Sequence, residues 1–276
     1  MAGILSNISS ENKVRLLFCI VLFEYLMFIF SGVSFAAMHR NTFFSIEVDP
    51  ASCIFYFIRI PQFIAVYHWA GVLLDISILV LLMLFIRYPQ ANGLAILLFV
   101  FLLLFYVTLM GHLGHHNYQF GFFMVFVPFI FSREVNKQFA FEATRYFLLF
   151  FYVSAAFLKL SAGALSDQNL FSHLLSGQFT PYYLEGNTGI RTTGNLYLIG
   201  HPAASYSLYI CSFIVELIML IGFFTKRFDS WLALILLVFH FGNWFIMDIA
   251  PLGQMAFICL LFLSRELSLE TCPVNP

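Results

Sequence analysis

The chain has 276 residues, of which 61% are hydrophobic and only 10% are charged. A mean hydropathy of +0.90 and 37 phenylalanines exclude an ordinary soluble domain. The net charge of −1, without a basic cluster, excludes nucleic acid as a partner. We therefore expect an all-α integral membrane protein whose main partner is the lipid bilayer.

Apolar runs separated by breaker residues predict a bundle of about eight transmembrane helices, which form a single domain over residues 1–276. The fourth and eighth helices are short for a membrane span, and residues 164–203 are expected to form a long outer loop. In chain order, the expected helices cover residues 14–37, 62–86, 93–111, 117–132, 143–163, 204–224, 230–247 and 251–264.

The basic residues predict how this bundle is oriented in the membrane. With a cytoplasmic N-terminus, nine of the 13 lysine and arginine residues lie on the cytoplasmic side. The positive-inside rule then places both termini in the cytoplasm. The four exceptions, on the outer side, are Arg40, Arg59, Lys159 and Arg191.

The stretch Gly111–Gly121 concentrates histidines on this expected outer face. It reads G-H-L-G-H-H-N-Y-Q-F-G, and polar groups at membrane depth are costly unless they have partners or a function. Residues 112–116 match the H-x-x-H-H box of membrane di-iron enzymes. Those enzymes need several such boxes, on the cytoplasmic side, whereas the other five histidines here are single. We therefore predict no metal site.

Lys159 lies near the outer end of the fifth expected helix, and two interpretations of it stay open. Its ammonium can snorkel to the lipid headgroups while its stem remains in the bilayer. Alternatively, it lies in a cavity of low dielectric, where loss of hydration favours the neutral amine and makes it a general base. In the seventh helix, His240 and Asn243 share one face, either for helix packing or for a site.

Three carboxylates fall inside the expected spans. Glu24, Asp75 and Glu216 must be protonated or paired there, and the proton relays of transporters have this character. A proton-coupled transporter predicts that the three line one continuous path. Against it, the sequence lacks paired half-helices interrupted by glycine and proline.

Three segments, in order and spacing, resemble the HTTM membrane domain of the vitamin K-dependent gamma-carboxylase and its bacterial relatives. They are G-H-H-N-Y-Q-F-G-F-F at 114–123, A-A-F-L-K-L at 155–160 and F-H-F-G-N-W-F-I-M at 239–247. The resemblance extends from Lys13 to about Ser264. It implies a bacterial cytoplasmic membrane and an active site on the extracytoplasmic face.

The resemblance also implies a reaction and the residues that perform it. The base removes a proton from a hydroquinone of the vitamin K type or another kind, and O2 converts the hydroquinone to an epoxide through a strongly basic alkoxide. That alkoxide deprotonates a peptide glutamate, to which CO2 adds, and a water-poor pocket protects it from quenching. The implied catalytic residues are Lys159 as the base with His116 and His240, and the implied quinone-binding residues are His115, Asn117, Tyr118 and Asn243.

The carboxylase carries a large soluble domain that grips its peptide, and the 276 residues here contain no counterpart. Peptide capture is then expected from residues 164–203 or from a second membrane protein, or it does not occur. A different hypothesis is a non-enzymatic membrane scaffold that binds lipid, quinone or a partner protein. The enzyme predicts a buried Lys159 amine beside an apolar cavity, whereas the scaffold predicts an exposed amine and no cavity.

Overall fold

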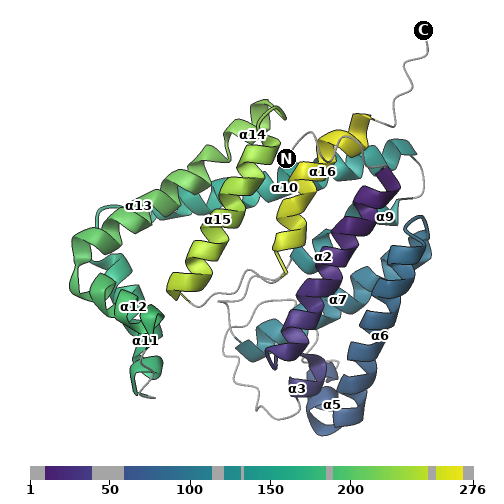
Figure 1. Ribbon diagram of the computed structural model, residues 1–276, viewed down its shortest axis with the longest axis horizontal. Helices are drawn as coiled ribbons and strands as arrows, with labels where there is room; N and C mark the ends of the chain where they lie inside the picture. Colours follow the sequence, from purple (N-terminus) through teal and green to yellow (C-terminus); the bar gives the residue numbers. More distant parts are fainter. Residues whose placement is uncertain are drawn as a thin grey trace. The chain divides into compact units, whose positions relative to one another are not determined.

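The computed structural model describes residues 10–38, 59–113, 121–131, 134–184, 189–247 and 253–269, and every regular element within these ranges is a helix (Figure 1). The chain divides into two compact units. Unit 1 comprises Met1–Arg145 and Pro251–Pro276, and unit 2 comprises Tyr146–Ala250. Helix α10, Glu134–Ser161, begins in unit 1 and ends in unit 2.

Unit 1 is built around helix α2, which packs against α6 and against α16 from the far end of the chain. Helix α6 also packs against α3, α5 and α7. The helices of unit 1, besides the start of α10, are α2 (Ser10–Phe30), α3 (Phe35–Met38), α5 (Ile60–Val66), α6 (His68–Arg87), α7 (Asn92–Leu113), α8 (Gly121–Met124), α9 (Val127–Ile130) and α16 (Met255–Leu269).

Phenylalanine rings fill the core of unit 1. The ring of Phe18 lies 4.6 Å from that of Phe85, 4.8 Å from that of Phe126 and 5.0 Å from that of Phe129, between centroids. The rings meet edge to face or tilted, as their quadrupoles favour. All four side chains are fully or almost fully buried, so that aromatic packing excludes solvent and lipid from this part of the core.

Glu24 is buried in this unit and caps the N-terminus of α16. Its carboxylate accepts hydrogen bonds from the backbone N–H groups of Gly253 (3.1 Å), Met255 (2.8 Å) and Ala256 (3.4 Å). The first N–H groups of a helix have no partner within the helix. The carboxylate therefore satisfies donors that apolar surroundings would otherwise leave unpaired.

Asp75 has the same kind of role at the start of α3. It accepts hydrogen bonds from the backbone N–H groups of Phe35 (3.2 Å) and Ala36 (2.9 Å). It also accepts one from the hydroxyl of Tyr25 at 2.7 Å. Glu24 and Asp75 thus both hold the starts of helices in place.

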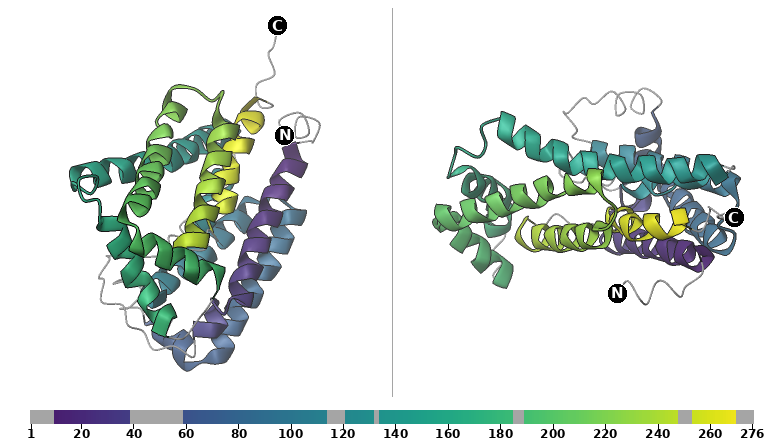
Figure 2. Two further views of the ribbon diagram at one scale, coloured as in Figure 1. Left: turned by 60° about the vertical axis from the view of Figure 1, so that its left-hand side comes forward. Right: turned by 90° about the horizontal axis from the view of Figure 1, so that it is seen from above.

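Unit 2 consists of the second part of α10 followed by five helices. Helix α11 packs against α12 and α13, and α13 packs against α15 (Figure 2). Gly222 lies in the short helix between α13 and α15. A Cβ added to it would lie 2.7 Å from the side chain of Leu149, so that glycine lets Leu149 pack close to the backbone there. The five helices are α11 (Leu170–Leu184), α12 (Ile190–Gly200), α13 (Pro202–Ile218), α14 (Ile221–Phe224) and α15 (Asp229–Met247).

The structure confirms the helical fold class over the described residues, and its apolar helices are compatible with an α-helical membrane protein. Five described helical segments are long and apolar enough to span one, and two more apolar helical segments are shorter. The five candidates are Glu11–Met38, His68–Arg87, Gln138–Ser161, Pro202–Phe224 and Asp229–Ile246.

Several expected boundaries differ from those observed. Residues 164–203 were expected to be a loop, but they contain α11 and α12. Helix α10 begins at Glu134 rather than at 143, because a polar first turn is tolerated ahead of its apolar part. Within 117–132, the described residues form the two short helices α8 and α9 instead of one span.

Candidate functional site

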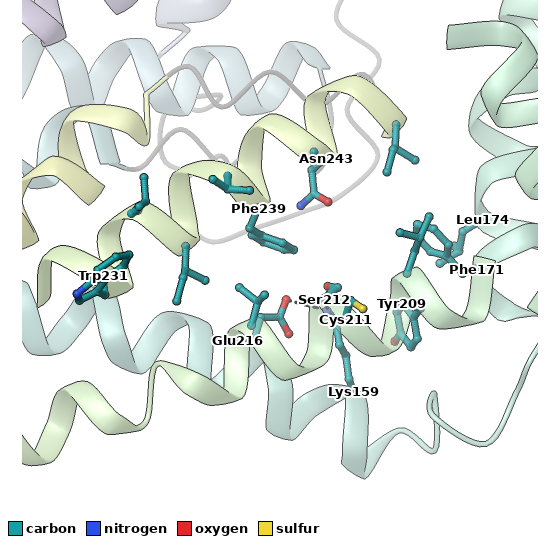
Figure 3. A pocket seen from close by; sticks show the side chains of 17 residues that line it. Lys159, Phe171, Leu174, Tyr209, Cys211, Ser212, Glu216, Trp231, Phe239 and Asn243 are labelled. Atoms are coloured by element: carbon teal, nitrogen blue, oxygen red, sulfur yellow. Dashed lines mark hydrogen bonds and ion pairs between the residues drawn. The ribbon is translucent and has the colours of Figure 1, made fainter. Parts of the chain in front are cut away.

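Unit 2 contains a cavity of about 750 Å³ beside the last turn of α10 (Figure 3). Its walls are mostly apolar, and Tyr209, Ser212 and Glu216 lie near Lys159. The lining residues are Lys159 from α10, Phe171 and Leu174 from α11, Leu208, Tyr209, Cys211, Ser212, Val215 and Glu216 from α13, and Trp231, Leu234, Ile235, Val238, Phe239, Gly242, Asn243 and Ile246 from α15.

Helical spacing explains why α13 and α15 face each other across this cavity. Tyr209, Ser212 and Glu216 lie three and four residues apart, which places them on one face of α13. Phe239 and Asn243, four residues apart on α15, project into the cavity from the opposite side in Figure 3. The site is therefore formed by one polar stripe of α13 and one largely apolar stripe of α15.

The Lys159 amine lies at the polar end of the cavity. Its Nζ donates hydrogen bonds to Glu216 Oε1 at 2.7 Å and to Ser212 Oγ at 3.0 Å. It also lies 5.3 Å from the centre of the Tyr209 ring, within the range of a cation–π interaction. The Lys159 side chain is 23% exposed and that of Glu216 only 7%. The amine is thus half-buried and is held at the cavity by an ion pair.

A second polar contact joins α10 to α15. The hydroxyl of Tyr152 and Nε2 of His240 are 2.6 Å apart, and Tyr152 is buried. Tyr152 precedes Lys159 by two helical turns, so both residues project from the same face of α10. The pair fixes the imidazole ring, one turn before Asn243, within unit 2.

Helix α11 brings Phe171 and Leu174 to the cavity, and the two helices that it packs against are anchored by polar contacts to backbone carbonyls. Arg191 of α12 donates a hydrogen bond to the carbonyl of Trp244, in the last turn of α15, at 3.0 Å. The last carbonyls of a helix lack partners within the helix, and a cation there is favourable. The hydroxyl of Tyr206 donates to the carbonyl of Leu165 at 2.7 Å. These contacts hold α12 and the start of α13.

The residues predicted from the sequence fall into three groups. Lys159, Asn243 and Glu216 line the cavity, and His240 is bonded to Tyr152 beside it. Glu24 and Asp75, the other two expected relay groups, bind backbone N–H groups in unit 1. His115, His116, Asn117 and Tyr118 lie outside the described residues.

Three other residues of the site were not predicted from the sequence. Tyr152 is one of 13 tyrosines and lies in an aromatic run, so nothing distinguishes it. Ser212 and Tyr209 share the face of Glu216, and this spacing is a signal that could have identified them.

Among the described residues, no group of three histidine, cysteine, aspartate or glutamate side chains is placed to hold a metal ion. The chain matches no protein-family model, no curated protein and no solved structure.

Proposed function

We propose that the protein is a membrane enzyme that binds a lipid-soluble hydroquinone in this cavity and removes a proton from it at Lys159 and its partners. The single observation that carries the proposal is the half-buried Lys159 amine, paired with Glu216, at the polar end of a mostly apolar cavity of about 750 Å³. Binding sites for small molecules commonly combine apolar walls with a few convergent polar groups.

The cavity also suits the ligand class in its shape and chemistry. Phe171, Phe239 and Trp231 provide aromatic and apolar walls for a ring and its alkyl chain. Asn243, on the wall opposite Glu216, supplies an amide for a second oxygen of the ligand. His240, held by Tyr152, is a positioning residue beside the site.

In this proposal the chemistry follows the vitamin K-dependent gamma-carboxylase type. The deprotonated hydroquinone reacts with O2, and the resulting base modifies a peptide or a small substrate, with CO2 as the added group where carboxylation occurs. Exclusion of water from an apolar cavity lengthens the lifetime of a strong base. The site faces the extracytoplasmic side of a bundle of about eight spans, with both termini in the cytoplasm.

Oxidation of a hydroquinone by the purified protein tests the proposal. The protein in detergent is loaded anaerobically with dimethylnaphthohydroquinone, whose methylated quinone ring cannot react with thiols. O2 is then admitted, and the epoxide and quinone are separated by chromatography. We expect turnover by the wild type and a loss of about 100-fold or more in Lys159→Ala, which removes the amine from the proton-transfer site. Lys226→Ala, a lysine outside the cavity, is the matched control.

A second candidate is non-enzymatic binding of a quinone or lipid, and the ion pair favours it specifically. Lys159 already has an anionic partner at 2.7 Å, so that the amine is stable without any reaction. In this case the hydroquinone protects Cys211, an exposed cavity cysteine, from a maleimide, while Cys19 of unit 1 reacts as before. Protection without turnover by the wild type establishes binding and excludes the oxygenase.

A further inference from the structure

The two oxygens of Glu216 have different surroundings. Oε1 accepts the hydrogen bond from Lys159 Nζ. Oε2 is buried, and no donor among the described residues bonds to it. A buried acceptor without a donor costs free energy, and such an atom in a native structure calls for an explanation. The Glu216 side chain lines the cavity, so that a small rotation of its carboxylate would present Oε2 to a donor on a ligand there.

Lys159 offers the complementary group. An ammonium has three N–H donors, and two of them bind Glu216 and Ser212. No other described residue accepts a hydrogen bond from this amine, so that a third N–H is available. The polar end of the cavity therefore presents one acceptor and one donor side by side.

This combination selects one chemical group in the ligand. A hydroxyl donates one hydrogen bond and accepts others, so that it satisfies both Glu216 Oε2 and Lys159 Nζ. A ligand ammonium would satisfy Oε2 but would face the charge of Lys159. A ligand carboxylate or quinone oxygen would accept from Lys159 but would leave Oε2 without a donor. The site thus distinguishes a hydroquinone from its quinone.

We propose that Glu216 is a catalytic residue whose Oε2 binds the ligand hydroxyl and receives its proton, while Lys159 holds the resulting anion. The proposal rests on the proposed function, since the ligand is taken to be a hydroquinone. It changes the assignment of roles: the sequence resemblance makes Lys159 the base, whereas the geometry points to the carboxylate as the atom that accepts the proton.

The proton transfer is balanced without a further reactant. The O–H bond of the hydroquinone breaks, its electron pair stays on the ligand oxygen, and the proton forms an O–H bond with Oε2. The product is a neutral Glu216, a Lys159 ammonium and an aryloxide between them. In apolar surroundings, the adjacent ammonium stabilises that anion more strongly than it would in water.

The test compares two ligands that differ only in their hydroxyl donors. Dimethylnaphthohydroquinone donates hydrogen bonds, and its dimethyl ether cannot. Both are titrated anaerobically, with protection of Cys211 from a maleimide, followed by mass spectrometry, as the measure of binding and Cys19 as the internal control. A hydrogen bond to a charged acceptor predicts that the wild type prefers the hydroquinone roughly 10- to 100-fold.

Two variants assign this preference to Glu216. In Glu216→Gln, the amide keeps the size of the side chain but cannot take up the proton, and we expect the preference to fall to about threefold or less. The affinity for the dimethyl ether should stay the same, which shows that the cavity is intact. The double variant Lys159→Met/Glu216→Gln leaves no unpaired charge at the site, and it should also lose the preference. It therefore tests the proposal even if Glu216→Gln alone does not fold.

Absorption of the bound ligand reports the proton transfer itself. The wild type should give the spectrum of the naphtholate anion at a pH where the free hydroquinone is neutral, and Glu216→Gln should give the spectrum of the neutral form. A preference for the hydroquinone that survives Glu216→Gln, or an anion spectrum that survives it, overturns the assignment to Glu216 and leaves the hydroquinone cavity standing. Absence of any protection by either ligand in the wild type overturns both proposals.

Discussion

Three carboxylates that lie inside apolar helices have different partners in the two units. In unit 1, Glu24 and Asp75 bind backbone N–H groups at the starts of α16 and α3. In unit 2, Glu216 binds the side chain of Lys159 through one oxygen and leaves the other without a donor among the described residues. All three lie in apolar helices, where the sequence alone makes them look alike.

The difference separates a structural carboxylate from a chemically available one. A carboxylate bonded to backbone N–H groups serves the fold, because its partners cannot move without unwinding a helix. A carboxylate bonded to a lysine beside a cavity has a partner with rotatable bonds, so both side chains can turn toward a ligand without unwinding a helix. Four substitutions test this contrast, from the largest expected effect on stability to the smallest.

Glu24→Ala should have the largest effect on the free energy of unfolding. Three backbone N–H groups lose their acceptor in apolar surroundings, so we expect a loss of about 3–5 kcal/mol. Unfolding by denaturing detergent measures the loss, and hydrogen exchange should accelerate at Gly253, Met255 and Ala256. Glu142→Ala, a partly exposed carboxylate of α10, should cost less than about 1 kcal/mol. Equal losses in both variants would contradict the capping role.

Gly71→Ala tests the packing of α3 on α6, which Asp75 supports. The new Cβ would lie 2.5 Å from the carbonyl oxygen of Phe35, a backbone atom that cannot turn aside. We expect a loss of about 2–3 kcal/mol, typical of overpacking. Gly93→Ala in α7 is the matched control, because its Cβ would meet nothing within 4 Å. A Gly71→Ala protein as stable as Gly93→Ala would show that α3 moves freely.

Glu216→Gln should have a smaller effect on stability than either of these. The amide oxygen can still accept the hydrogen bond from Lys159, and the partly exposed amine can keep its contact with Ser212. We expect a loss of about 1 kcal/mol in the same unfolding assay. A loss as large as that of Glu24→Ala would place Glu216 among the structural carboxylates and remove the contrast between the units.

Gly242→Ala should change stability least, and in the opposite direction. A Cβ at this cavity residue of α15 would meet no atom within 4 Å. Alanine replaces glycine inside a helix, so we expect a gain of about 0.5–1 kcal/mol. Gly242→Leu should add side-chain volume to the cavity and lower hydroquinone affinity about 10-fold, by the protection of Cys211. An unchanged affinity in Gly242→Leu would show that the hydroquinone does not bind against this wall of the cavity.

The sequence predicted the helical membrane class and several long helices well, since apolar runs near 20 residues leave few alternatives. It failed at residues 164–203, where two short helices carry enough polar residues to resemble a loop. A signal was present before α11, because Asp167 accepts a hydrogen bond from the N–H of Asn169, a turn typical of a helix start.

For the site, polarity inside an apolar helix identified Lys159, Glu216 and Asn243 as candidates. The pairing of Lys159 with Glu216 was not predictable, because it depends on how α10 and α13 pack over a separation of 57 residues. Spacing rules apply within one helix and do not determine which faces of two helices meet.

The exposed wall of the cavity determines the route by which a ligand enters it. Trp231, Leu234 and Val238 line the cavity and are also 62%, 41% and 65% exposed, on a helix apolar enough to span a membrane. A hydroquinone dissolved among lipid tails would meet this surface by diffusing in the plane of the membrane. The concentration that governs binding is then the mole fraction of hydroquinone in lipid or detergent. Adding empty micelles at constant total ligand would dilute the ligand and lower the occupancy of the cavity.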